Sequence, residues 1–146
     1  MRDFRFDTSH IQWVHVDGGS DFPYRVDHDY AVLGGSPKTG ALDMLVRFAP
    51  NGHCPRHRHV APTSTLVLEG EQHLWDTLEN GETRHRVRRA GEYALSDGDD
   101  LHLEAGGPQG GLIYLSMHSR DGHLFDVVDE NLEVLQTVTI ESLLNT

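Results

Sequence analysis

Apolar residues along this chain occur in short runs that alternate with polar residues, as in LDMLVRF at residues 42–48. Alternation with a period of two is typical of β-strands that bury one face. Gly, Pro, Asn and Asp separate the runs, at roughly the spacing of eight to twelve residues found in all-β proteins. The pattern predicts strands over residues 11–16, 30–33, 41–48, 65–69, 71–75, 83–88, 93–95, 101–104, 112–117, 124–128 and 133–136.

Turn-forming residues between these runs predict hairpins. Asn80-Gly81 is flanked by apolar segments, and such a pair favours a type I′ turn, in which both central residues take positive φ. Only residues 140–144 are predicted to be helical. We therefore predict an all-β fold, an antiparallel jelly-roll barrel with a short C-terminal helix at most. Residues 1–40 lack the regular hairpin spacing, and we expect an outer strand or an arm contributed to a partner.

Length and charge restrict the class of protein. A chain of 146 residues is expected to form a single domain, residues 1–146, with its own core. The formal charge of −11 argues against nucleic acid or an anionic membrane as a partner. The N-terminus resembles no signal peptide, no apolar run is long enough to span a membrane, and Cys54 has no second cysteine to pair with. We expect a cytoplasmic protein.

Three histidines are the best candidates for chemistry. His57 and His59 lie two positions apart, and on a strand such side chains point to the same face. The chain holds eleven histidines, so one such pair is weak evidence by itself. His102 can meet the pair inside a barrel from a neighbouring strand. Three neutral imidazoles would bind one divalent metal and leave positions open for water or substrate.

Residues 45–105 resemble the two motifs of the cupin superfamily. In the first motif, G-x5-H-x-H-x3,4-E-x6-G, His57 and His59 fill the histidine positions and Gly70 is the closing glycine. The opening Gly52 lies one residue closer to His57 than the motif asks. The glutamate position is occupied by Thr63, which leaves six residues before Gly70.

The second motif, G-x5-P-x-G-x2-H-x3-N, follows in the expected order. Counted from Gly91, His102 falls on the histidine position. Asp97 stands at the proline position, Gly98 comes one residue early, and Gly106 replaces the asparagine. Two motifs in the right order are far more specific than either alone, and the resemblance implies a single-domain cupin fold.

Threonine is a poor metal ligand, so the resemblance implies an uncharged set of three ligands, His57, His59 and His102. The site is similar to those of three-histidine cupins, which include acetylacetone-cleaving dioxygenases and the cupin domain of ChrR-like anti-sigma factors. In the dioxygenases the three histidines hold Fe(II), which binds a β-diketone enolate and O2, whereas the anti-sigma domains bind zinc. The resemblance implies one divalent metal, Fe(II) first and Zn(II) next, with Mn(II) or Ni(II) as further options.

The function that this resemblance implies first is a mononuclear, non-haem Fe(II) dioxygenase. It would cleave a C–C bond of a small enolisable, β-diketone-like substrate, and we expect a homodimer. A non-catalytic cupin that senses or binds zinc or a small ligand stays open as an alternative. So does a metal-dependent isomerase or lyase for a sugar or hydroxy acid, which would use Arg47 or Arg58 to bind an anion. Fold alone does not separate these classes.

Glu104 is the candidate catalytic carboxylate. It lies two positions after His102 and shares its face if the strand is regular. It could be an acid or base, a fourth ligand or a hydrogen-bond partner of a histidine; the alternative is a carboxylate at the barrel rim. Glu69 has the same parity as His57 and His59 but precedes a turn glycine, so we expect it in solvent.

Other residues near the motifs receive structural interpretations. His53 is expected in an exposed loop, and Cys54, whose parity opposes the histidine pair, as a buried apolar residue. On the strand at 112–117 the face with Ile113 and Leu115 is expected to be the inner one, which leaves His118 on the other face. Packing roles are expected for Trp75 and Tyr114, and surface or core-edge positions for His10, His15, His28, His73, His85 and His123.

Overall fold

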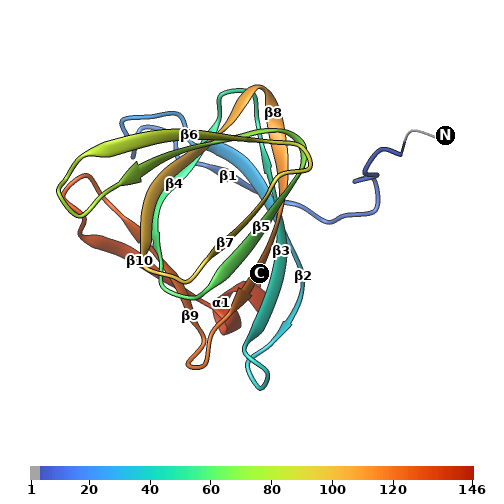
Figure 1. Ribbon diagram of the computed structural model, residues 1–146. Helices are drawn as coiled ribbons and strands as arrows, with labels where there is room; N and C mark the ends of the chain where they lie inside the picture. The colour runs from blue at the N-terminus through green and yellow to red at the C-terminus, as the bar shows by residue number, and fades with distance from the viewer. Residues whose placement is uncertain (1–3) are drawn as a thin grey trace.

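Residues 4–146 form ten strands in one antiparallel sheet and one short helix (Figure 1). The computed structural model describes residues 4–146. The elements are β1 (Val14–Asp17), β2 (Asp27–Ser36), β3 (Ala41–Phe48), β4 (His53–His59), β5 (Thr63–Thr77), β6 (Thr83–Arg89), β7 (Tyr93–Ser96), β8 (Asp100–His118), β9 (His123–Val128), β10 (Val134–Thr139) and α1 (Ile140–Leu144). This nearly all-β architecture confirms the predicted fold class, including the short C-terminal helix.

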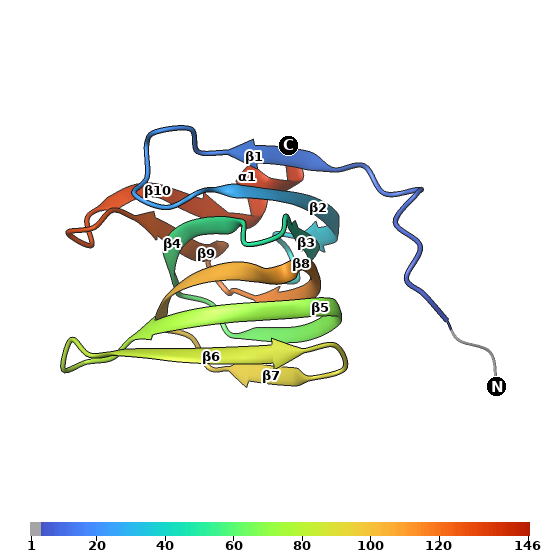
Figure 2. The same ribbon diagram turned by 90° about the horizontal axis from the view of Figure 1, so that it is seen from above.

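The sheet curls into a half-barrel around its buried face (Figure 1). Its strand order is β1-β2-β3-β8-β4-β9-β10, and β5 pairs with β8 while β6 and β7 pair with β5. Seen from above in Figure 2, β1 and α1 lie at one side, β6 and β7 at the other, and β8 between them. The 19-residue β8 pairs with β3, β4 and β5 and so connects the two sides of the half-barrel.

Two predicted strand breaks are wrong. The sequence predicts separate strands on either side of Gly70 and across residues 105–111, but β5 and β8 run through both segments with register shifts. Glycines make this possible because the two strands approach very closely there. A β-carbon on Gly70, whose φ is 68°, would lie 2.4 Å from the Gly110 carbonyl oxygen, and one on Gly111 would lie 2.3 Å from that of Glu71. The glycines therefore bend continuous strands instead of ending them.

The hairpin between β5 and β6 is present, but its turn differs from the predicted type. Gly81 has a φ of 84°, whereas Asn80 is not among the residues with positive φ. The Gly81 N–H donates to the Leu78 carbonyl (2.9 Å) and the Leu78 N–H to the Glu82 carbonyl (2.8 Å). A β-turn followed by one left-handed glycine explains these bonds, so the loop is longer than a two-residue type I′ turn.

The core fills the concave face of the half-barrel. Leu42, Ile113 and Met117 are each fully buried, and Leu115 is 8% exposed, so the apolar face of β8 is the inner one, as predicted. The helix α1 packs against this core through Ile140 and Leu143. Its N-terminus carries a capping box between Thr139 and Ser142.

Within residues 4–40 the chain forms β1 at an edge of the sheet and β2, which pairs with both β1 and β3. Residues 1–3 of the predicted arm lie outside the described residues. Contribution of the arm to a partner stays a prediction. In the described part of the chain, no helix has the length and apolar character needed to cross a membrane.

Candidate metal centre

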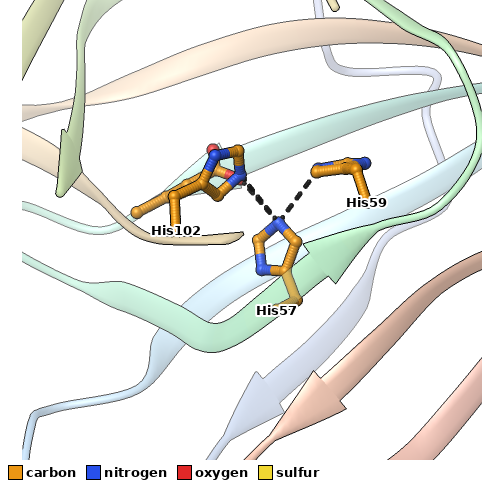
Figure 3. A group of neighbouring side chains, drawn as sticks. His57, His59 and His102 are labelled. Carbon is orange, nitrogen blue, oxygen red and sulfur yellow. Dashed lines mark hydrogen bonds and ion pairs between the residues drawn. The ribbon is translucent and has the colours of Figure 1, made fainter. Parts of the chain in front are cut away.

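The three predicted histidines meet on the buried face because β4 and β8 pair in the required register. His57 is directly opposite His102, and His59 lies two residues further along β4. Their side chains point toward one another in Figure 3. The Nε2 atom of His57 lies 3.0 Å from that of His59 and 3.1 Å from that of His102. All three residues are less than 8% exposed.

Glu104 completes this group. Its Oε1 lies 3.0 Å from His57 Nε2 and 3.2 Å from His102 Nε2, and the residue is 4% exposed. One ligand atom from each of the four residues lies within 4.8 Å of all the others. The rim alternative for Glu104 is therefore wrong. The group offers one carboxylate oxygen beside the three imidazole nitrogens, so Glu104 can supply the fourth ligand that the sequence left open, and the uncharged three-histidine set stays a prediction.

Outer contacts orient the histidines on β4. His57 Nδ1 lies 2.8 Å from the Pro55 carbonyl, to which it can only donate. Thr63 Oγ1 lies 3.0 Å from the Ala61 carbonyl and 3.3 Å from His59 Nδ1. The hydroxyl donates to the carbonyl and accepts from the imidazole, so His59 also carries its proton on Nδ1. Thr63 thus orients a histidine from the position where the cupin motif has a ligand.

On the β8 side, an amide side chain of β5 supports Glu104. Gln72 is 2% exposed, and its Nε2 donates to Glu104 Oε2 at 2.7 Å. That bond leaves Oε1 directed at the histidines. His102 Nδ1 is 3.9 Å from Asp76 Oδ1, too far for a hydrogen bond, and this nitrogen is buried without a hydrogen-bond partner among the described residues. Arg84 and Arg86 hold the Asp76 carboxylate.

The protonation of the group suits a bound cation. With Nδ1–H bonds on His57 and His59, their Nε2 lone pairs face each other at 3.0 Å, which is unfavourable unless a cation lies between them. Burial opposes charge on His57, but Cys54 and Glu104 outweigh it and raise the pKa of His57 well above its usual range. A proton on His57 Nε2 can therefore serve as the cation between the two nitrogens. A divalent metal fits the same donor set of imidazole nitrogens and a carboxylate.

Glu104 and His59 have the charge states that a metal site needs. Burial alone would raise the pKa of Glu104, but hydrogen bonds from His102 and His57 outweigh it and hold that pKa well below its usual range. Burial lowers the pKa of His59 well below its usual range, and the nearby His57 and His102 lower it further. The carboxylate is charged and His59 is neutral, as ligands must be.

A cavity of about 270 Å³ opens onto His57, His59 and Glu104. Most of its wall is apolar, with Phe125 packed 5.5 Å from the His57 ring, centroid to centroid. None of the described lining residues is a lysine or arginine, and Glu104 is the one acid among them. The wall comprises Val16, His28, Tyr30, Met44, Val46, Cys54, Pro55, His57, His59, Glu104, Leu115, Phe125, Val127, Gln136, Val138, Ser142, Leu143 and Thr146.

Cys54 is buried, as predicted, but the parity argument for it is wrong. The register of β4 against β8 shifts between Cys54 and His57, a bulge that includes Pro55. The bulge turns Cys54 onto the inner face, where its Sγ lies 3.9 Å from His57 Nδ1. Its thiol therefore lines the cavity, and burial raises its pKa.

The remaining candidates lie away from the histidine group. His53 is half-buried in β4 and stacks on Trp75, with ring centroids 5.6 Å apart, rather than lying in an exposed loop. Glu69 and His118 are exposed, as expected for Glu69. Tyr114 donates to Asp43 at 2.8 Å.

Two residues of the site had no motif to reveal them. His28 is 8% exposed and lines the cavity, instead of lying at the surface or core edge. His28 lies two positions before Tyr30, so alternation would have placed both side chains on one face of a strand. The predicted strand, residues 30–33, begins too late to include His28, whereas β2 begins at Asp27. Gln72 alternates with the inward Leu74 and Asp76 in the second half of β5, although an isolated glutamine indicates no particular chemistry.

The chain resembles known proteins in both sequence and structure. A family model described as the ChrR Cupin-like domain matches residues 1–120. No curated protein sequence matches the chain. Among solved structures, an acetylacetone dioxygenase from Acinetobacter johnsonii is 16% identical, with a TM-score of 0.69 over 99% of this chain and 96% of that one.

Two further structures show the same fold. A cupin 2 conserved barrel domain protein from Rhodopseudomonas palustris is 8% identical, with a TM-score of 0.66 over 84% of this chain and 81% of that one. An RmlC-like cupin protein from Ralstonia eutropha JMP134 is 14% identical, with a TM-score of 0.67 over 99% and 87%. At these identities the likeness concerns the fold alone.

Proposed function

The chain belongs to the ChrR cupin-like family, and from this we propose that it is a mononuclear metal enzyme, a dioxygenase that cleaves a C–C bond of a small enolisable substrate. The observation that carries the proposal is the cluster of His57, His59, His102 and Glu104, of which all but His102 line an apolar cavity of about 270 Å³. The proposed reaction is the one that the sequence resemblance implies first, and the acetylacetone dioxygenase of Acinetobacter johnsonii has the same fold.

His57, His59 and His102 would hold the ion, with Glu104 beside them. When bound, Fe(II) would supply Lewis acidity and a redox-active centre at which the substrate's electrons can reach O2. Glu104 is the one carboxylate among the described wall residues, so it is the group that would take the substrate's acidic proton, at Oε1. Gln72 would keep that oxygen directed at the site through its bond to Oε2.

The cavity wall favours a small, largely apolar substrate. Phe125, Val127 and Met44 would contact its carbon skeleton, and the enclosure would exclude bulk water. Arg47 and Arg58, the residues expected to bind an anion in a sugar or hydroxy-acid isomerase or lyase, are elsewhere. Arg47 bonds to Asp29 and Arg58 to Asp99. This placement gives that alternative no support.

A non-catalytic zinc-binding or sensing role is the second candidate. Three nitrogens and one carboxylate oxygen can satisfy a four-coordinate Zn(II) without an open position, which is typical of structural sites. The family model is described as the ChrR Cupin-like domain, and the sequence resemblance associates ChrR-like cupin domains with zinc.

Metal analysis and oxygen uptake distinguish these roles. Protein purified without chelators should carry about one metal ion per chain, and His57→Ala should lose it while His118→Ala, a change at an exposed histidine, should not. Metal-free wild-type protein would refute the proposed metal site.

Fe(II)-loaded protein should consume O2 with β-diketones or hydroxyaryl ketones, and Glu104→Gln should lose this activity. Tight Zn(II) binding without turnover on the whole panel would favour the sensor.

We also propose that the chain forms a homodimer. Tyr93 and Leu95 on β7 are 63% and 69% exposed, and β7 pairs with β5 alone among the described strands. An apolar edge strand of this kind is a favourable surface for self-association.

A further inference from the structure

A second pair of histidines lies on the outer face of the hairpin between β5 and β6. Gln72 and Leu74 of β5 are buried, so the alternation of the strand places His73 on the opposite, outward face. His85 on β6 is exposed. Their nearest nitrogens, His73 Nδ1 and His85 Nε2, are 2.9 Å apart. Neither residue belongs to the group at the cavity.

The separation of these nitrogens matches that of two adjacent ligands on one metal ion. With metal–nitrogen bonds of about 2.0–2.1 Å, two ligands at a right angle lie about 2.9 Å apart. The hydrogen bond joins two nitrogens that can each supply a lone pair. A metal bound at a right angle lies off the line between the nitrogens, so both rings turn to direct their lone pairs at it, and the exposed His85 leaves room for this movement.

Glu71 prepares His73 for this role. Its Oε1 lies 3.1 Å from His73 Nε2, so that nitrogen donates to the carboxylate and Nδ1 keeps its lone pair toward His85. A carboxylate on the far nitrogen is the usual partner of a metal-binding histidine. Arg89 Nε lies 3.5 Å from the other oxygen of Glu71. Gly107 leaves room for the carboxylate, because a β-carbon there would be 2.5 Å from Oε1.

Stacking orients the second ligand. The His85 ring is nearly parallel to Trp75, with an interplanar angle of 8° and centroids 4.9 Å apart. Because His85 is exposed and the His73 side chain is 19% exposed, water can reach the nitrogen pair and complete the coordination of an ion.

We propose that His73 and His85 form a second transition-metal site, independent of the site at the cavity. The ion binds His73 Nδ1 and His85 Nε2, and the proton between them moves to His85 Nδ1. Two imidazoles with open water positions favour Cu(II) over Ni(II) and Zn(II). Hard ions such as Mg(II) and Ca(II), which prefer oxygen ligands, do not bind there.

Trp75 provides the measurement, since Cu(II) bound beside it quenches its fluorescence. The chain has two tryptophans, and Trp13→Phe leaves Trp75 as the only one. In this background, Cu(II) titration should quench the fluorescence to saturation at one site. His85→Ala and His73→Ala should weaken the quenching isotherm at least tenfold, and Glu71→Gln about tenfold.

His123→Ala is the matched control, because His123 bonds to Asp126 at 2.7 Å without a second histidine within bonding distance among the described residues. It should leave the titration unchanged. Electron paramagnetic resonance of the bound Cu(II) should show two nitrogen ligands, and one in His85→Ala. Unchanged quenching in folded His85→Ala would overturn the proposal. So would quenching that disappears in a folded His57→Ala variant, because the ion would then be at the cavity.

Discussion

Thr63→Val tests the role of the threonine that replaces the motif glutamate. The change removes one hydroxyl and preserves the shape of the side chain at a position that is 5% exposed. In the wild type this oxygen accepts from His59 Nδ1 and donates to the Ala61 carbonyl. The variant therefore leaves the buried imidazole N–H without an acceptor and removes the constraint on the orientation of His59.

The size of the effect follows from these contacts. An unpaired buried donor costs about 1–3 kcal/mol, and the similar volume of valine adds no cavity cost. Loss of a hydrogen-bond partner of a metal-binding histidine weakens metal affinity about 10- to 100-fold, or about 1.4–2.8 kcal/mol. We expect metal-free Thr63→Val to unfold about 1–3 kcal/mol more easily and to bind Zn(II) at least about tenfold more weakly.

Thr65→Val is the matched control. Thr65 lies two residues along the same face of β5 and is 6% exposed, but its hydroxyl makes no hydrogen bond to any other side chain of residues 4–146. Urea unfolding of the metal-free proteins gives the stability difference, and competition with a chromophoric chelator gives the Zn(II) affinity. Thr65→Val should match the wild type in Zn(II) affinity. Equal losses in both variants would refute the orienting role of Thr63.

Three further changes address other contacts. Gln72→Leu removes the donor to Glu104 Oε2 and should destabilise the metal-free protein by about 1–3 kcal/mol, measured by urea unfolding; wild-type stability would contradict the role given to Gln72. For Asp29, burial raises the pKa but hydrogen bonds led by His15 and including Arg47 outweigh it, so the folded pKa lies below the ordinary 3.8. The stabilisation is complete above pH 3.8 and is lost as pH falls through the folded pKa. Asp29→Asn should therefore cost up to about 1 kcal/mol at pH 7, and this cost should shrink progressively when urea unfolding is repeated below pH 3.8. Leu95→Glu should convert the proposed dimer to a monomer in sedimentation, and an unchanged mass would exclude β7 from the interface.

Much of the fold was available from local patterns. The alternation at residues 41–48 predicted β3 at its observed bounds, Ala41–Phe48, and α1 was predicted at residues 140–144. These segments follow local rules, because a period of two or a single helical turn depends on neighbouring residues alone. The cupin spacing also identified His57, His59 and His102 as a set, which the pairing of β4 with β8 brings together.

Departures from regular strand geometry defeated the same reasoning elsewhere. Parity placed Cys54 on the wrong face, because a bulge in β4 adds a residue that alternation does not count. Glycine suggested that β5 ended at Gly70, whereas close contact with β8 requires glycine within a continuous strand. Such features depend on a partner strand far away in sequence.

The sequence by itself determined an all-β cupin fold and three histidines on one inward face, because alternation and motif spacing encode which side chains share a face. Only the tertiary structure decided that Glu104 joins the histidines while Thr63 orients one of them. It likewise brought His73 beside His85 across a hairpin. Distances between strands follow from register, bulges and packing over the whole sheet, which no local pattern of residues contains.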